Sequence, residues 1–185
     1  MDIKKMLKPI ISAATGLLGL IFLAINYMTV SATVWGQSFS RGLDNGYGFC
    51  FFDPLYENMD ASFFGYITSG ALLVVFLASI ALLLVAAAKI LRDMKILQLP
   101  ENVCLCKVDR LVSRVFQIAV AVAFVCTLIF GFANSQDGLS LVPGAGAWLL
   151  LVLAVVSALA PKFIAKMNVS VPAEEAAKEE EKTEE

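Results

Sequence analysis

The sequence predicts an all-α membrane protein: a four-helix transmembrane bundle of up-down-up-down topology, with a short β-hairpin in the first outer loop. The 185-residue chain is 59% hydrophobic and 16% charged, whereas an average globular domain carries about 25% charged residues. Its mean hydropathy is +0.79. Residues 9–40, 61–88, 115–136 and 138–161 contain no charge. Each stretch exceeds the roughly 18 residues that a helix needs to cross a bilayer, so a soluble globular domain is excluded.

These stretches divide the chain into alternating spans and loops. The expected spans are residues 9–30, 61–88, 115–134 and 144–163. Residues 31–60 form an outer loop with the hairpin, and residues 135–143 form a short second outer loop. Residues 1–8, a basic loop over residues 89–114 and an acidic tail over residues 164–185 are expected in the cytoplasm. The tail has no large apolar residue after Val171, so it is expected to be disordered or a frayed helix.

The basic residues predict the orientation, because cytoplasmic flanks of spanning helices carry an excess of Lys and Arg. Eleven of the 14 basic residues flank the spans on one side: Lys4, Lys5, Lys8, Lys89, Arg92, Lys95, Lys107, Arg110, Arg114, Lys162 and Lys166. Only Arg41 falls on the opposite face. Both termini are therefore expected in the cytoplasm.

A cleaved signal peptide is the alternative for the N-terminus. Lysines precede an apolar segment, and Val30-Ser31-Ala32 resembles a small-residue cleavage site. The uncharged segment from residue 9 to 29 has 21 residues, longer than the usual apolar region of about 7–15 residues in a signal peptide. Cleavage would remove residues 1–32 and leave three spans.

Small residues predict the faces on which the spans pack, because helices in lipid associate through close packing and side-chain hydrogen bonds. Such residues recur at alternate three- and four-residue steps in every span. The expected helix-packing residues are Ser12, Gly16, Gly19 and Asn26; Gly65, Ser69 and Ser79; Ala119, Ala123 and Cys126; and Ala147, Ala154 and Ser157. We interpret these seams as the bundle interior. A pore or ligand groove and a homodimer interface are the alternatives.

The composition also limits the chemistry. Apart from Lys162 at the inner end of the last span, the spans hold no ionisable Asp, Glu, Lys or Arg, which argues against a proton-coupled transporter. The chain has no His, the side chain most often used for acid–base catalysis near neutral pH and the commonest metal ligand. No catalytic, cofactor-binding or metal-binding residues are expected. The net charge of −2 suggests no nucleic-acid partner.

The first outer loop carries the expected hairpin. Residues 32–35 and 47–52 are β-prone, and Asp44-Asn45-Gly46 between them is a strong turn signal. Aromatic residues crowd this loop and favour the level of the lipid headgroups. The expected outer-loop contact residues are Trp35, Tyr47, Phe49, Phe51 and Phe52. Headgroup anchoring and a partner-binding surface are the two roles considered for them.

This arrangement is broadly similar to that of claudin-type and other tetraspan junction or vesicle proteins. Trp35-Gly36 and the Cys50-Phe51-Phe52-Asp53 segment resemble the claudin first outer loop. The claudin pattern has two loop cysteines and a Trp-Gly-Leu-Trp stretch, and this chain has neither. Family membership therefore does not follow from these residues.

The cytoplasmic loop forms a basic collar that is expected to contact anionic lipid of the inner leaflet, at roughly 1 kcal/mol per basic residue near the surface. The collar residues are Lys89, Arg92, Lys95, Arg110 and Arg114. Cys104 and Cys106 are interpreted as ordinary thiols, with metal binding by a dimer and acylation as the alternatives.

The expected function is that of a non-catalytic integral membrane protein acting through lateral protein contacts, as a scaffold or accessory subunit. Its partners would be the lipid bilayer and either another membrane protein or a second copy of the chain. The alternative is a small channel or carrier subunit for an uncharged or lipid-like solute.

Overall fold

The computed structural model of the chain describes residues 3–34, 37–50, 60, 62–94, 96, 105–135 and 139–169. Within them, helices and strands follow in the order α1–β1–β2–α2–α3–α4–β3–α5. Trp35, Phe51, Phe52, Lys95, Cys104 and the part of the expected 164–185 tail from residue 170 onward lie outside the described residues.

Four long helices make up most of the structure: α1 (Ile3–Leu23), α3 (Ser62–Asp93), α4 (Leu105–Ala133) and α5 (Ala145–Val169). Three helices in the described chain are long and apolar enough to cross a membrane, over Ser62–Arg92, Leu105–Ala133 and Ala145–Phe163. The prediction of a mainly helical membrane protein is confirmed at this level. α1 contributes a shorter apolar segment, Leu7–Leu23, which is about 25 Å long at 1.5 Å per residue.

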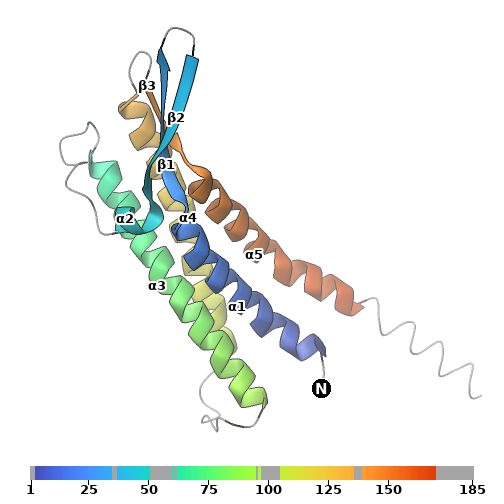
Figure 1. Cartoon of the computed structure of the whole chain (residues 1–185). Helices are drawn as coiled ribbons and strands as arrows, with labels where there is room; N and C mark the ends of the chain where they lie inside the picture. Colours follow the sequence, from blue (N-terminus) through green and yellow to red (C-terminus); the bar gives the residue numbers. More distant parts are fainter. Residues whose placement is uncertain are drawn as a thin grey trace, which may run out of the picture.

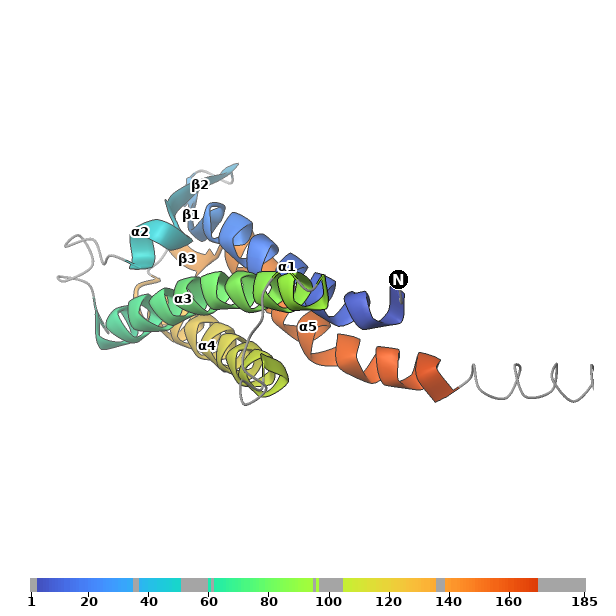
Figure 2. The same cartoon turned by 90° about the horizontal axis from the view of Figure 1, so that it is seen from below.

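The helices lie side by side, with the small sheet at one end (Figure 1). α3 packs along both α4 and α1, and α5 packs against α1 and α4. Two views show α5 leaning away from α4 at the end opposite the sheet (Figures 1 and 2). We call that end the basic end, because Lys8, Lys89, Arg110, Arg114 and Lys162 gather there around one cavity. The opposite end is the sheet end.

α1 is shorter than the expected first span of residues 9–30. The helix ends at Leu23, and strand β1 (Asn26–Val34) begins soon after it. From Met28 to Thr33, apolar side chains alternate with hydroxyl-bearing ones, several of them β-branched, which favours a strand over a helix. Asn26 lies in β1 rather than on a helix face, which corrects its expected place on the packing seam of the first span.

β1 is the central strand of a three-stranded antiparallel sheet of order β2-β1-β3. β2 covers Gln37–Asn45 and β3 covers Leu139–Pro143. Val30 of β1 lies opposite Arg41 of β2 on one side and Leu141 of β3 on the other. The short loop before α5 therefore supplies a strand, so the sheet joins both loops of this end instead of lying in the first alone.

The expected hairpin has the wrong register. The observed hairpin pairs β1 with β2, so its turn comes before the Asp44-Asn45-Gly46 signal, and β2 ends within that signal. Asn45 instead caps the short helix α2 (Gly46–Cys50), because its Oδ1 accepts a hydrogen bond from the backbone N–H of Gly48 at 2.8 Å. Asn is a favoured N-cap for this reason. Tyr47 and Phe49 consequently lie in a helix rather than in a strand.

The core runs between the helices and continues under the sheet. Leu72, Val75 and Leu82 of α3 and Phe116 and Phe130 of α4 are nearly or fully buried. Tyr27 and Met28 extend this core from β1. The outward faces carry exposed aliphatic residues such as Leu77, Leu84, Ile118, Val125 and Val152, as expected of helices that face lipid.

Candidate functional site

The structure places most of the expected helix-packing residues on inward faces. Gly16, Gly19, Gly65, Ser69, Ser79, Ala119, Ala123, Cys126, Ala147, Ala154 and Ser157 are buried, Ser12 is half-buried and Asn26 is exposed. Two of them, Ser12 and Ser157, line the cavity at the basic end. Part of the seam is therefore the wall of a cavity rather than a dry helix contact.

α1 and α3 approach each other closely at two glycines of α1. A Cβ atom added to Gly16 would lie 2.6 Å from the backbone oxygen of Ser79. One added to Gly19 would lie 2.6 Å from Ser79 Oγ and 3.2 Å from the ring of Phe116. Real Cβ atoms do not approach oxygen so closely, so the two helices meet at a separation that only glycine allows.

α2 is held against the long helices at the sheet end. Tyr47 Oη donates a hydrogen bond to the carbonyl oxygen of Leu20 at 2.8 Å, and its ring meets that of Phe76 edge-on. Ser69 Oγ donates to the carbonyl oxygen of Cys50 at 3.3 Å. Tyr47 therefore has a structural contact within the chain, and the headgroup-anchoring and partner-binding roles considered for it stay predictions.

Phe49 is also an internal residue. It is 1% exposed, and its ring packs against that of Tyr27, with centroids 5.7 Å apart. Tyr27 Oη accepts a hydrogen bond from Thr127 Oγ1 at 3.3 Å. Burial raises the pKa of Tyr27 and raises the pKa of the Cys50 thiol to about 11. Both groups are therefore neutral near pH 7, and this end of the core carries no charge from them.

A cavity of about 390 Å³ lies at the basic end. Binding sites for small molecules commonly have volumes of about 300–1,000 Å³. All four long helices line the cavity. Its lining residues are Lys8, Ile11, Ser12, Thr15, Leu82, Lys89, Cys106, Asp109, Arg110, Ser113, Arg114, Gln117, Ser157, Ala158, Pro161 and Lys162.

The lining residues form helical stripes. On α4, Cys106, Arg110, Ser113 and Gln117 follow one another at steps of three or four residues, so they share one face. The α1 residues from Lys8 to Thr15 and the α5 residues from Ser157 to Lys162 recur at similar steps. Regularly spaced residues on one face of each of these three helices therefore line the cavity.

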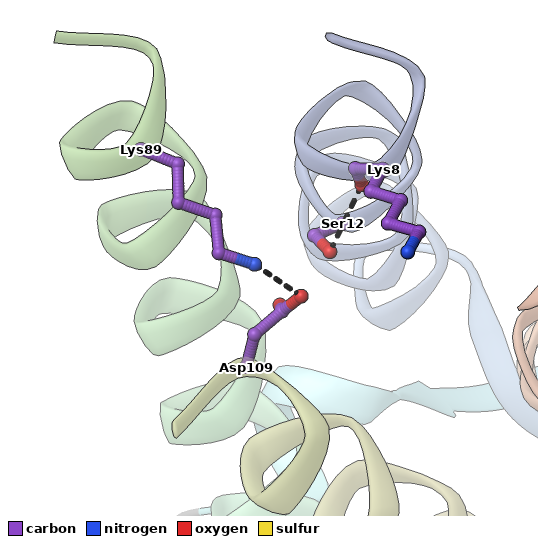
Figure 3. Close-up of polar contacts among 4 residues, drawn as sticks. All are labelled: Lys8, Ser12, Lys89 and Asp109. Carbon is purple, nitrogen blue, oxygen red and sulfur yellow. Dashed lines mark hydrogen bonds and ion pairs between the residues drawn. The ribbon is translucent and has the colours of Figure 1, made fainter. Parts of the chain in front are cut away.

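An ion pair fixes one side of the cavity. Lys89 Nζ of α3 lies 2.6 Å from Asp109 Oδ2 of α4, and both side chains are largely buried. Figure 3 shows this pair beside Ser12 and Lys8 of α1, which line the same cavity. Asp109 Oδ1 is buried without a hydrogen-bond partner within the described residues. Because Asp109 balances only one of the five lining cations, the described lining residues carry a net charge of +4.

The interior of the cavity is polar but less charged. Gln117 Nε2 donates to Ser113 Oγ at 3.3 Å and to Ser157 Oγ of α5 at 3.1 Å. Thr15 and Ser12 donate their hydroxyl protons to carbonyl oxygens one turn earlier on α1. Their oxygen lone pairs, together with Gln117 Oε1, remain as hydrogen-bond acceptors.

Sequence reasoning identified part of this site. The basic collar included Lys89, Arg110 and Arg114, which do line the cavity. The sequence did not indicate that Lys8 and Lys162, which are remote in the chain, line the same cavity as these residues. The helical spacing from Arg110 to Gln117 was the available signal. Arg92 belongs to the expected collar but is not a lining residue.

Within the described residues, no group of three or more His, Cys, Asp or Glu side chains is placed to hold a metal ion. Cys106 is exposed, whereas Cys50 and Cys126 are buried free thiols. No protein-family model, curated protein or solved structure matches this chain.

Proposed function

We propose that the chain is a non-catalytic membrane protein that holds a lipid-like molecule in the cavity at its basic end. Four membrane crossings, with the basic end and both termini in the cytoplasm, belong to this proposal. The single observation that supports it best is the cavity, where cationic and apolar residues face the same space. Such a lining matches a molecule with a polar head and an apolar body.

The apolar part of the lining supports a lipid-like ligand over a free ion. Ile11, Leu82, Ala158 and Pro161 line the cavity together with the charged residues. The volume of about 390 Å³ corresponds to about 13 water molecules, at roughly 30 Å³ each in the liquid. A bare ion would leave most of that space to water, whereas a headgroup and the first part of its chains would fill it.

The hydroxyl groups support binding rather than catalysis. Ser12, Thr15 and Ser157 each donate their proton to a carbonyl of their own helix. A serine nucleophile instead needs an adjacent base that accepts its proton. These side chains are thus suited to line a binding site.

The proposal is tested by filling the cavity. Ala158→Phe places a ring in the space, and Ala121→Phe places the same ring on an exposed position of α4 that does not line it. Both variants and the parent chain are purified in mild detergent, and bound lipid is measured by native mass spectrometry. We expect Ala158→Phe alone to lose bound lipid. Equal retention by all three proteins would contradict the proposal.

A second function, lateral contact with another copy of the chain, is favoured by one observation. β2 is an edge strand of the described sheet, and Phe39 is 62% exposed. Edge strands offer unpaired backbone groups to a further strand. If two β2 strands pair antiparallel with Gly42 opposite Leu43, Arg41 of each copy lies opposite Asp44 of the other. Opposite charges at paired positions stabilise such strands.

This second function is tested by charge reversal. Arg41→Glu would place two acidic side chains opposite one another, so a dimer held by β2 should dissociate. Lys107→Glu makes the same charge change on α4, far from β2, and serves as the control. Mass measured by light scattering in detergent reports the outcome. A parent chain that is monomeric, or a dimer unaffected by Arg41→Glu, would rule the contact out.

A further inference from the structure

We infer that the cavity at the basic end recognises a phosphate ester, with Arg110 and Arg114 of α4 as the phosphate-binding residues and Gln117 as an acceptor for a hydroxyl group beside the phosphate. This inference rests on the proposed lipid-binding function and names the chemistry of the ligand. The shared chemistry is an anionic phosphate ester, whether it belongs to a membrane lipid or to a soluble molecule.

The charge of the cavity calls for an anion. Lys8, Arg110, Arg114 and Lys162 line it, and within the described chain none of their charged side-chain groups has an ion-pair or hydrogen-bond partner. Asp109, the one acidic residue among the described lining residues, is paired with Lys89. An anion in the cavity would therefore relieve the repulsion among four unpaired cations without breaking an existing pair.

Arginine makes phosphate the best match among common anions. Arg110 and Arg114 are four residues apart, so both guanidinium groups leave the same face of α4. The planar guanidinium group donates two parallel hydrogen bonds to phosphate oxygens, a geometry that lysine does not offer. Lys8 and Lys162 add charge from the opposite helices, α1 and α5.

The deeper wall selects for a hydroxyl group near the phosphate. Gln117 is one turn beyond Arg114 on the same face, and its Nε2 is engaged with Ser113 and Ser157. Its Oε1 has no hydrogen-bond partner in the part of the chain that the structure describes. A hydroxyl donor on the ligand would satisfy that oxygen, and a phosphoglycerol headgroup carries such donors next to its phosphate.

The experiment measures lipid bound to the full chain in mild detergent by native mass spectrometry, so that no other phosphate ester competes for the cavity. The probes are phosphatidylglycerol, which has the phosphate ester and hydroxyl groups, and diacylglycerol, which has a hydroxyl group and no phosphate. Glycerol 3-phosphate in solution represents the soluble source. Arg110→Gln/Arg114→Gln removes the two guanidinium groups, and Arg92→Gln/Lys107→Gln removes the same net charge from this end outside the cavity.

We expect phosphatidylglycerol to bind in preference to diacylglycerol. Arg110→Gln/Arg114→Gln should weaken its binding about tenfold or more, since charge-assisted hydrogen bonds are among the strong ones. The control pair should change it by less than about twofold at physiological salt, where exposed charges are screened. Arg114→Lys keeps the charge and the fold, and an intermediate loss in that variant would identify bidentate binding.

Other outcomes distinguish a failure of the phosphate inference from a failure of the proposed lipid-binding function. Equal binding of phosphatidylglycerol and diacylglycerol, or equal losses in the two double variants, would overturn the phosphate inference and leave lipid binding intact. Binding of no lipid and no glycerol 3-phosphate would overturn both. Binding of glycerol 3-phosphate in preference to the lipid would support phosphate recognition and contradict the proposed lipid function.

Discussion

Gln117 of α4 donates a hydrogen bond from Nε2 to Ser157 Oγ of α5, over 3.1 Å, and both residues line the cavity at the basic end. It is an interhelical side-chain hydrogen bond between residues 40 positions apart in the sequence. Ser157 Oγ in turn donates a hydrogen bond to the carbonyl oxygen of Ala154 at 2.8 Å. The pair therefore closes the inner wall of the cavity and holds α5 in place.

We predict a measurable coupling between these two residues. In a double-mutant cycle with Gln117→Leu and Ser157→Ala, the coupling free energy of unfolding should be about 0.6 kcal/mol, the average for interhelical hydrogen bonds in membranes. Unfolding in mixed detergent micelles measures it. Additive effects of the two substitutions would show that this hydrogen bond does not contribute to stability.

The Gly16 contact gives a prediction with a built-in control. Gly16→Ala should destabilise the protein by about 1–3 kcal/mol, because the new methyl group must push α1 away from Ser79. Gly70 of α3 has no atom within 4 Å of its added Cβ. Gly70→Ala should therefore leave stability unchanged or raise it by about 0.5–1 kcal/mol through helix propensity. Thermal melts in one detergent compare them, and equal losses would contradict the close α1–α3 contact.

The Lys89–Asp109 pair predicts a non-additive result. Lys89→Met leaves the largely buried Asp109 carboxylate without its partner, which should cost about 1–3 kcal/mol. Lys89→Met/Asp109→Leu removes both charges and should recover most of that loss. The free energies of unfolding of the parent chain, the single variant and the double variant test this prediction. A double variant less stable than Lys89→Met would contradict this account of the pair.

Cys50 predicts a dependence on pH. Burial raises its pKa from 9.0 to about 11 in the folded chain. Folding thus favours the neutral thiol, and the associated stability is complete below pH 9 and is lost as the pH rises through 11. Since the thiolate is the reactive form, Cys50 should resist alkylation at pH 8, where exposed Cys106 reacts. Mass spectrometry of alkylated peptides measures both, and equal rates at pH 8 would contradict the burial of Cys50.

The long helices could be predicted from the sequence, because a long charge-free segment in lipid must satisfy its own backbone hydrogen bonds and a helix does so. The end of α1 could not be predicted in this way. Hydropathy averaged over a window hides the alternation from Met28 to Thr33, which favours strand β1. Likewise, Asp44-Asn45-Gly46 is a real boundary signal, but it does not distinguish a hairpin turn from the N-cap that Asn45 forms on α2.

The cavity could not be predicted from the sequence for a different reason. The spacing of Arg110, Ser113 and Gln117 predicts a shared helix face, but it does not predict what lies opposite that face. Lys8 and Lys162 are brought there by the packing of α1 and α5, which depends on contacts between distant segments. The strand β3 was missed for the same reason, because its five residues pair with β1 more than 100 positions earlier.

The central claim is that the basic end faces the cytoplasm and the sheet end faces the opposite side. In two variants without Cys50, Cys104 and Cys126, one keeps Cys106 and the other replaces it with Ser and carries Ser38→Cys. Ser38 is exposed on β2, and Cys106 is exposed on α4. An epitope tag before Met1 reports the N-terminus and thereby whether α1 crosses the membrane.

The measurement is labelling of these single cysteines with an impermeant maleimide, on sealed cells and on opened cells. The account predicts that Ser38→Cys is labelled in sealed cells, while Cys106 reacts, and the tag binds antibody, only after the membrane is opened. Labelling of Cys106 or exposure of the tag in sealed cells would contradict it, because the basic cavity would then not open toward the cytoplasm with both termini.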